Sequence, residues 1–142
     1  KEMGLTRRDA MALGAGTLAA TAISAVPAFA STAETEIAGF TGGADMVEGG
    51  VTLTAPEIAE NGNTVPISVA APDAVEMAVF ATENPVPKVL TVSFGPLNTS
   101  HSLSTRIRLA GTQEVVAVAQ MADGSFHRAS AIVKVTIGGC GG

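Results

Sequence analysis

The chain has 142 residues and a formal net charge of −5, with 13 acidic and 8 basic side chains. This acidic balance argues against nucleic acid and anionic membrane surfaces as partners, because both attract positive charge. The sequence contains no tryptophan and no tyrosine, which argues against an aromatic stacking platform or a carbohydrate site.

The first 30 residues have the pattern of a twin-arginine export signal. Arg7 and Arg8 lie in a charged segment, and residues 10–26 are small or apolar without an ionised side chain. Ala28 and Ala30 then supply an A-x-A cleavage site. A membrane anchor is the alternative, but the apolar run is weakly hydrophobic and barely long enough to span a bilayer. We therefore expect cleavage of residues 1–30, a periplasmic location and no membrane attachment after cleavage.

Residues 31–142 are enough for one ordinary domain. Residues 31–50 contain five glycines and are expected to form an irregular leader with at most one short helical turn, over residues 45–48. The folded body is expected to span residues 51–137.

Alternation of apolar and polar residues predicts strands through this body. The alternation is clear at Val65, Ile67 and Val69, whereas residues 75–82 and 115–121 are more continuously apolar and are expected near the middle of a sheet. About seven strands are predicted, over residues 51–54, 64–69, 75–82, 90–94, 102–109, 113–121 and 126–137. Short strands separated by turns at this spacing predict an all-β fold, an immunoglobulin-like antiparallel β-sandwich.

Two local signals refine this prediction. Residues 122–125 read A-D-G-S and predict a hairpin between the last two strands. Pro66 lacks a backbone N–H, so it places its strand at a sheet edge or requires a bulge. A stripe of alternate apolar residues in the last strand ends at Ile137, which is therefore expected to be the last core residue.

The chain ends in Gly138-Gly139-Cys140-Gly141-Gly142. Glycine has no side chain to pack and adopts many backbone conformations. Residues 138–142 are therefore expected to form a flexible swinging arm that displays the thiol of Cys140. On this basis the substitution Gly139→Val should leave the melting temperature nearly unchanged.

Cys140 is the only cysteine, so no disulfide can form within the chain. A lone cysteine in an exported protein indicates a reactive thiol or an intermolecular disulfide. A catalytic thiol needs a nearby base, cation or helix N-terminus, and its glycine neighbours supply none of these. We therefore expect the chain to be a carrier protein whose cysteine bears a substrate for the active sites of other proteins, and not an enzyme. An exported interaction module that uses Cys140 for an intermolecular disulfide is the alternative.

Metal binding is not expected. His101 and His127 are far apart in the sequence and no cluster of acidic residues or methionines accompanies them, so a ligand set is missing. The sequence predicts neither a metal nor an organic cofactor.

Several segments resemble the SoxY family, the covalent sulfur carrier subunit of the bacterial thiosulfate-oxidising Sox system. They are residues 56–66, 83–87, 105–110 and 138–142, which read PEIAENGNTVP, ENPVP, TRIRLA and GGCGG. The resemblance extends from about Gly39 to Gly142. It implies that Cys140 carries thiosulfonate and persulfide intermediates of thiosulfate oxidation.

The same resemblance implies partners. A SoxZ-like subunit would form a heterodimer with this chain. A SoxAX-type cytochrome, a SoxB-type hydrolase and a sulfur dehydrogenase would be transient partners that act on the cargo.

Overall fold

The computed structural model describes residues 28–139. The predicted signal residues Arg7 and Arg8 and the predicted carrier residues Cys140, Gly141 and Gly142 lie outside this range. Ala28 and Ala30, the predicted cleavage residues, lie in the first turn of a helix. Within residues 28–139, no helix is both long and apolar enough to cross a bilayer.

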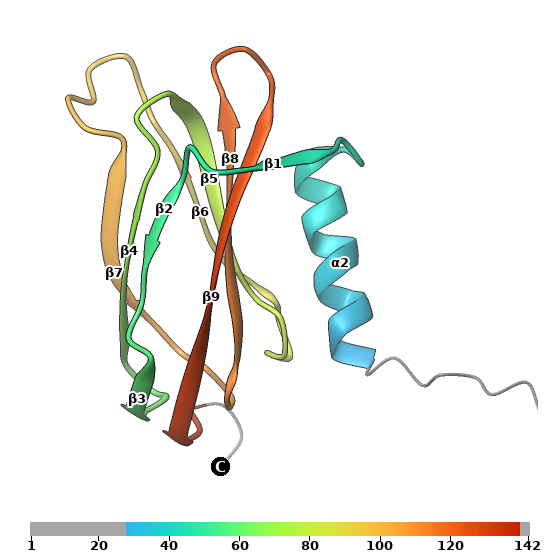
Figure 1. Ribbon diagram of the computed structural model, residues 1–142, viewed down its shortest axis with the longest axis vertical. Helices are drawn as coiled ribbons and strands as arrows, with labels where there is room; N and C mark the ends of the chain where they lie inside the picture. Colours follow the sequence, from blue (N-terminus) through green and yellow to red (C-terminus); the bar gives the residue numbers. More distant parts are fainter. Residues whose placement is uncertain (1–27, 140–142) are drawn as a thin grey trace, which may run out of the picture.

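The described residues form two packed β-sheets with one helix against the larger sheet (Figure 1). The larger sheet has the strand order β1-β9-β8-β5-β6, with β3 also paired to β9, and the smaller sheet has the order β2-β4-β7. The elements are α2 (Ala28–Thr41), β1 (Met46–Glu48), β2 (Thr52–Thr54), β3 (Ile58–Asn61), β4 (Val65–Ala70), β5 (Ala74–Ala81), β6 (Lys88–Ser93), β7 (Ser102–Ile107), β8 (Gln113–Met121) and β9 (Phe126–Ile137). This confirms the predicted all-β, immunoglobulin-like sandwich.

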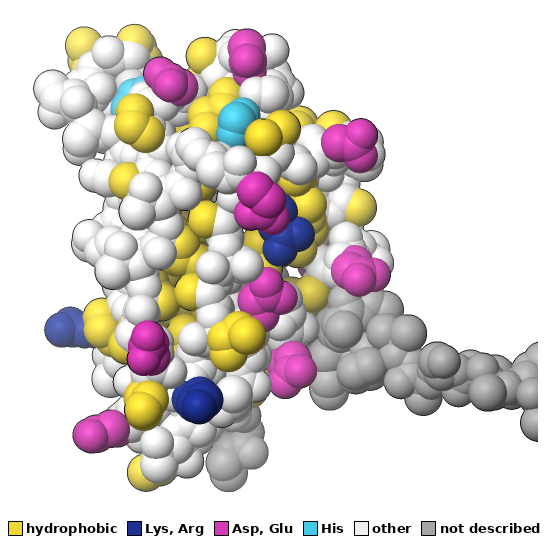
Figure 2. Space-filling view, in the orientation of Figure 1, with side chains coloured by type: hydrophobic (Ala, Val, Ile, Leu, Met, Phe, Trp, Pro, Cys, Tyr) yellow, Lys and Arg dark blue, Asp and Glu magenta, His cyan; other side chains and the backbone are white. Residues whose placement is uncertain are grey.

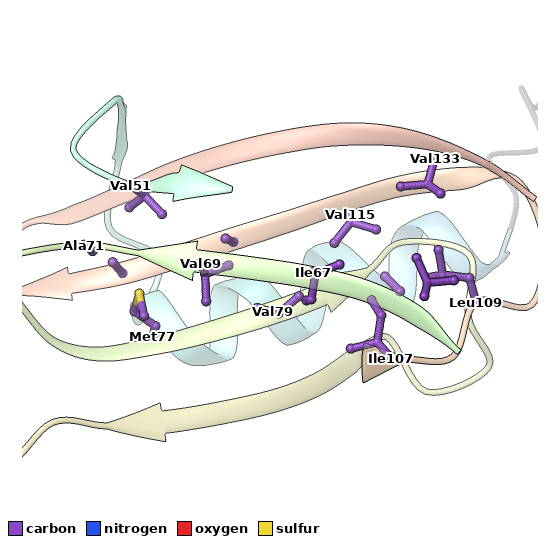
Figure 3. Close-up of a cluster of buried hydrophobic side chains, with 14 of the residues drawn as sticks. Val51, Ile67, Val69, Ala71, Met77, Val79, Ile107, Leu109, Val115 and Val133 are labelled. Carbon is purple, nitrogen blue, oxygen red and sulfur yellow. The ribbon is translucent and has the colours of Figure 1, made fainter. Parts of the chain in front are cut away.

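The alternating pattern of residues 65–69 identified core residues correctly. Val65, Ile67 and Val69 of β4 are buried, and their side chains meet those of β5, β8 and β9 between the sheets (Figure 3). The continuously apolar strands β5 and β8 lie inside the larger sheet, as predicted. The β8–β9 hairpin is also confirmed, and Gly124 in its turn has a φ of 87°, a conformation that glycine adopts without strain.

The sandwich is not wholly antiparallel. The short strands β1 and β3, which were not predicted, both run parallel to β9, with Met46 opposite Phe126 and Ala59 opposite Val135. Together they cover much of the free edge of β9, whose other edge pairs with β8. Covering an edge in this way protects it from pairing with other chains.

The prediction of an irregular leader over residues 31–50 is wrong. Helix α2 extends to Thr41, and residues 46–48 form strand β1 instead of a helical turn. Most of the glycines follow the helix: Gly42 and Gly43 have positive φ angles, and the Gly43 N–H donates to Ala38 O at 3.2 Å. This is the hydrogen bond of a glycine C-cap.

Helix α2 is held by a second apolar cluster on the outer face of the larger sheet. Ile37 and Phe40 pack against buried residues of β5 and β8, and Phe40 makes edge-on ring contacts with Phe80 at 6.3 Å and Phe126 at 5.9 Å. Such ring pairs add to the free energy gained by burial. Ala33 is also buried, so the buried face has the i, i+4, i+7 spacing of a helix. Alanine is a weak apolar marker and occurs on both faces of this segment, so the period was not recognised in the sequence.

Two further predictions need correction. Ile137 is 64% exposed and is not a core residue, because the β8–β9 pairing ends at Val133 and the last residues of β9 extend past β8. Strand β4, which contains Pro66, lies in the middle of the smaller sheet. However, β2 pairs only with residues 68–70, so at Pro66 the strand has β7 as its one neighbour.

Candidate functional site

Strand β9 leads the chain to the end of the sandwich where Cys140 follows the last described residue (Figure 1). Two other segments lie at this end: residues 61–63, which begin at the last residue of β3, and residues 108–111, which follow β7. We refer to these two segments as the base loops, and to Gly138 and Gly139 as the arm base.

Backbone hydrogen bonds join the arm base to both base loops. Gly139 N–H donates to Leu109 O at 2.8 Å, and Leu109 N–H donates to Gly62 O at 2.8 Å. The Gly62 N–H in turn donates to Ile137 O at 2.7 Å. These distances are those of well-formed hydrogen bonds, so three separate segments are fixed to one another through their main chains.

The segments approach so closely that side chains do not fit between them. A Cβ atom on Gly139 would collide with the Gly62 carbonyl and would lie 2.6 Å from Asn63 N. A Cβ on Gly62 would collide with Leu109 O and would lie 2.8 Å from Gly139 N, and a Cβ on Gly138 would collide with Ala110 O. Glycine is therefore required here by close backbone approach.

This packing corrects the predicted start of the flexible arm. Gly138 and Gly139 were expected to be free of the body, but the base loops hold both residues in place. The structure also predicts, against the expectation from sequence, that Gly139→Val lowers stability, because the valine side chain would occupy the space of the Gly62 carbonyl.

Two buried amides support the second base loop from within. Asn84 and Gln113 are 6% and 4% exposed. The Asn84 Nδ2 donates to Arg108 O at 2.8 Å, and its Oδ1 accepts from Ala110 N and from Gln113 Nε2, each at 2.8 Å. Asn84 therefore bonds on both sides of Leu109, the residue that accepts the Gly139 hydrogen bond.

Gln113 extends this network. Its Nε2 also donates to Gly111 O at 3.1 Å, and its Oε1 accepts from Glu83 N at 2.9 Å. Sequence reasoning did not assign a role to either amide. Asn84 lies in the segment 83–87 that carries part of the SoxY resemblance, but its burial depends on residues far away in the sequence.

The four segments that carry the resemblance therefore meet at one place. The tail, residues 61–63, Asn84 and residues 108–110 are all connected by the hydrogen bonds described above. Segments that are distant in the sequence thus form a single structural unit, and this unit holds the residue directly before Cys140.

The histidines take no part in this unit. His127 lies near the start of β9 and its Nδ1 is 2.9 Å from Gly49 O. His101 precedes β7 and stacks on Phe94 at 4.9 Å. Both are at the ends of their strands opposite to the arm base. Residues 28–139 contain no group of three or more His, Cys, Asp or Glu side chains that could hold a metal ion.

Electrostatics around the sandwich are dominated by acidic side chains, which are spread over the visible face (Figure 2). One carboxyl group has a perturbed pKa. Hydrogen bonds from the Ser125 hydroxyl at 2.6 Å and the Ser125 N–H at 2.9 Å lower the pKa of Asp123. Asp123 lies in the β8–β9 turn, away from the arm base, so this shift is a property of the turn.

Comparison with protein-family models matches residues 37–140 to the family described as sulfur oxidation protein SoxY. Among solved structures, the chain is similar to the sulfur carrier protein SoxY from Chlorobium limicola f thiosulfatophilum, with 37% identity and a TM-score of 0.66. That match covers 76% of this chain and 99% of the other. No curated protein sequence matches this chain.

More distant structures share the fold alone. A superoxide reductase (neelaredoxin) from Ignicoccus hospitalis is 15% identical with a TM-score of 0.53, covering 60% of this chain and 79% of that one. A putative superoxide reductase from Thermotoga maritima is 16% identical with a TM-score of 0.52, covering 68% and 89%. The family match spans most of the chain and includes Cys140, and the chain therefore belongs to the SoxY family.

Proposed function

We propose that this chain is a covalent carrier of sulfur intermediates in thiosulfate oxidation and that Cys140 is the attachment site. The observation that carries the proposal is the position of Cys140. It is the only thiol of a SoxY-family chain, and it directly follows a glycine that the body holds at the end of the sandwich.

The proposed chemistry begins at the Cys140 thiol. A SoxAX-type cytochrome would join thiosulfate to it: a sulfur–sulfur bond forms, the thiol proton leaves, and the two electrons released pass one at a time to the cytochrome as electron acceptor. A SoxB-type hydrolase then adds water to the terminal sulfonate group, which releases sulfate and leaves a persulfide on Cys140. A sulfur dehydrogenase acts on that remaining sulfur.

In this scheme the chain performs none of the reactions itself. The described residues supply a rigid body and a fixed starting point for Cys140, and the enzymes supply the electron acceptor and the activated water. Covalent attachment keeps a reactive persulfide from diffusing away between enzymes. We further propose a SoxZ-like subunit as the stable partner, and export to the periplasm through a twin-arginine signal that contains Arg7 and Arg8.

Intact mass spectrometry of the assembled complex tests the proposal. Wild-type protein and the Cys140→Ser variant are each incubated with thiosulfate and the oxidised SoxAX-type cytochrome alone, so that no later enzyme removes the cargo before the mass is measured. We expect thiosulfonate or added sulfur on the wild type and none on the variant. Wild-type protein that shows only free thiol or a disulfide-linked species would instead support the alternative, an interaction module joined through Cys140.

A further inference from the structure

We propose that Gly62 and Asn84 are positioning residues that fix the point from which Cys140 departs from the body. The base loops then hold the chain as far as Gly139, so the arm does not begin at Gly138 as the sequence predicted. This inference rests on the proposed function of Cys140 as the attachment site, and it adds a role for two residues that lie outside the arm.

Gly62 connects the end of β9 to the base loop that contains Leu109. Its N–H bonds to Ile137 O at the end of β9, and its carbonyl accepts from Leu109. Leu109 in turn accepts from Gly139. One residue thus links the strand that precedes the arm base to the loop that holds it, and a side chain on Gly62 would push against Leu109 O and Gly139 N together.

Asn84 holds the loop itself in shape. The Leu109 carbonyl accepts the Gly139 hydrogen bond only if residues 108–110 keep their path, and Asn84 bonds to Arg108 O and Ala110 N on either side of it. Because the amide is 6% exposed, water does not readily replace these bonds. Buried and fully bonded amides of this kind rigidify their surroundings.

The fixed arm base limits the reach of the thiol. Adjacent Cα atoms are about 3.8 Å apart, whereas five free residues would span up to about 17 Å. With Gly139 held, Cys140 starts one such step from the body, and its sulfur is only one short side chain further. Gly139 is therefore the point from which the reach of the Cys140 thiol is counted, and the base loops hold Gly139.

A matched pair of glycine variants tests the inference in the assembled carrier complex. Gly62→Ala places a Cβ into the backbone contact, while Gly111→Ala lies in the neighbouring base loop, where a Cβ meets nothing within 4 Å. We expect hydrogen exchange of the Gly139 amide to be about tenfold faster in Gly62→Ala, because exchange reports local opening. Gly111→Ala should match the wild type.

Function provides the second readout. For a SoxAX-type cytochrome with thiosulfate, we expect kcat/KM toward Gly62→Ala to fall about tenfold or more, because small misplacements of reacting groups are costly. The rate of Cys140 labelling by iodoacetamide should stay within about twofold, because a small reagent in solution requires no positioning. Asn84→Asp, which loses the donor to Arg108 O but keeps its size, should show the same direction of change.

The possible outcomes separate this inference from the proposed function. Equal Gly139 exchange and equal loading in Gly62→Ala and Gly111→Ala would overturn the positioning role. If Gly62→Ala does not fold, hydrogen exchange of the Gly139 amide in the wild type is the test. Exchange as fast as in an unstructured peptide would overturn the inference, and slower exchange would support it. Wild-type protein that never takes up sulfur would overturn the proposed function. Hydrogen exchange of the Gly139 amide would still test whether Gly62 and Asn84 hold the arm base.

Discussion

Replacing Asn84 by alanine removes the amide that supports the second base loop. Arg108 O and Ala110 N then lose the bonds to an amide that is itself 6% exposed, while Gln113 Nε2 keeps its bond to Gly111 O. A buried polar group left without a partner costs about 1–3 kcal/mol. Two such groups predict a loss of roughly 2–6 kcal/mol from the free energy of unfolding, a large part of the 5–15 kcal/mol of a typical domain.

Urea denaturation followed by circular dichroism measures this loss. The control is Asn98→Ala, because the Asn98 Oδ1 accepts one hydrogen bond, from Gly95 N at 2.7 Å, in an exposed turn. Water can replace that bond, so the control should lose less than about 1 kcal/mol. If Asn84→Ala is no less stable than Asn98→Ala, the described network does not hold the base loop.

Three further predictions concern other parts of the molecule. Gly139→Val should lower the free energy of unfolding by about 1–3 kcal/mol, measured by thermal denaturation; an unchanged melting temperature would show that the arm base is not packed. Phe40→Ala should cost about 2–4 kcal/mol because it removes the ring that anchors α2 on the larger sheet, whereas Leu97→Ala, at a side chain 95% exposed, should be nearly neutral in the same assay. Ser125→Ala should raise the pKa of Asp123 toward its ordinary value, because the serine hydroxyl is the largest cause of the lowered pKa. Any stability that the ionised Asp123 contributes is present above its ordinary pKa and is lost as the pH falls through the lowered pKa. An NMR titration of the variant in which the pKa of Asp123 does not rise would contradict this cause.

The strands could be predicted because their signal is local. Alternation of apolar and polar residues marks one buried face within each strand, and β4, β5, β8 and β9 lie where the alternation or apolar runs place them. Strands β1 and β3 have three and four residues, too few to show a period. Their pairing with β9 is set by the path of the chain and not by their own composition.

Helix α2 was missed for a related reason. The glycines of residues 31–50 were interpreted as a sign of irregular structure, yet Gly42 and Gly43 mark the end of a helix. The helix is stabilised by Phe40 against Phe80 and Phe126. Tertiary packing of this kind outweighs local propensity and cannot be read from the segment alone.

The contacts of the arm base could not be predicted from the sequence. The identity and position of Cys140 are evident from the sequence, and so is the glycine content around it. The contact between Gly62, Leu109 and Gly139 involves main-chain atoms of three distant segments. No pattern of side chains in the sequence indicates this contact. Gly138 and Gly139 were therefore interpreted as flexible, although they are needed for close packing of the backbone.

The central claim is that sulfur travels covalently on Cys140. Fragment-ion mass spectrometry of the C-terminal peptide, from carrier isolated out of cells oxidising thiosulfate, tests it most directly. The account predicts added sulfur or a thiosulfonate group localised to Cys140, and its absence in cells that carry Cys140→Ser. A peptide found only as free thiol or disulfide, or undiminished thiosulfate oxidation by the serine strain, would contradict it.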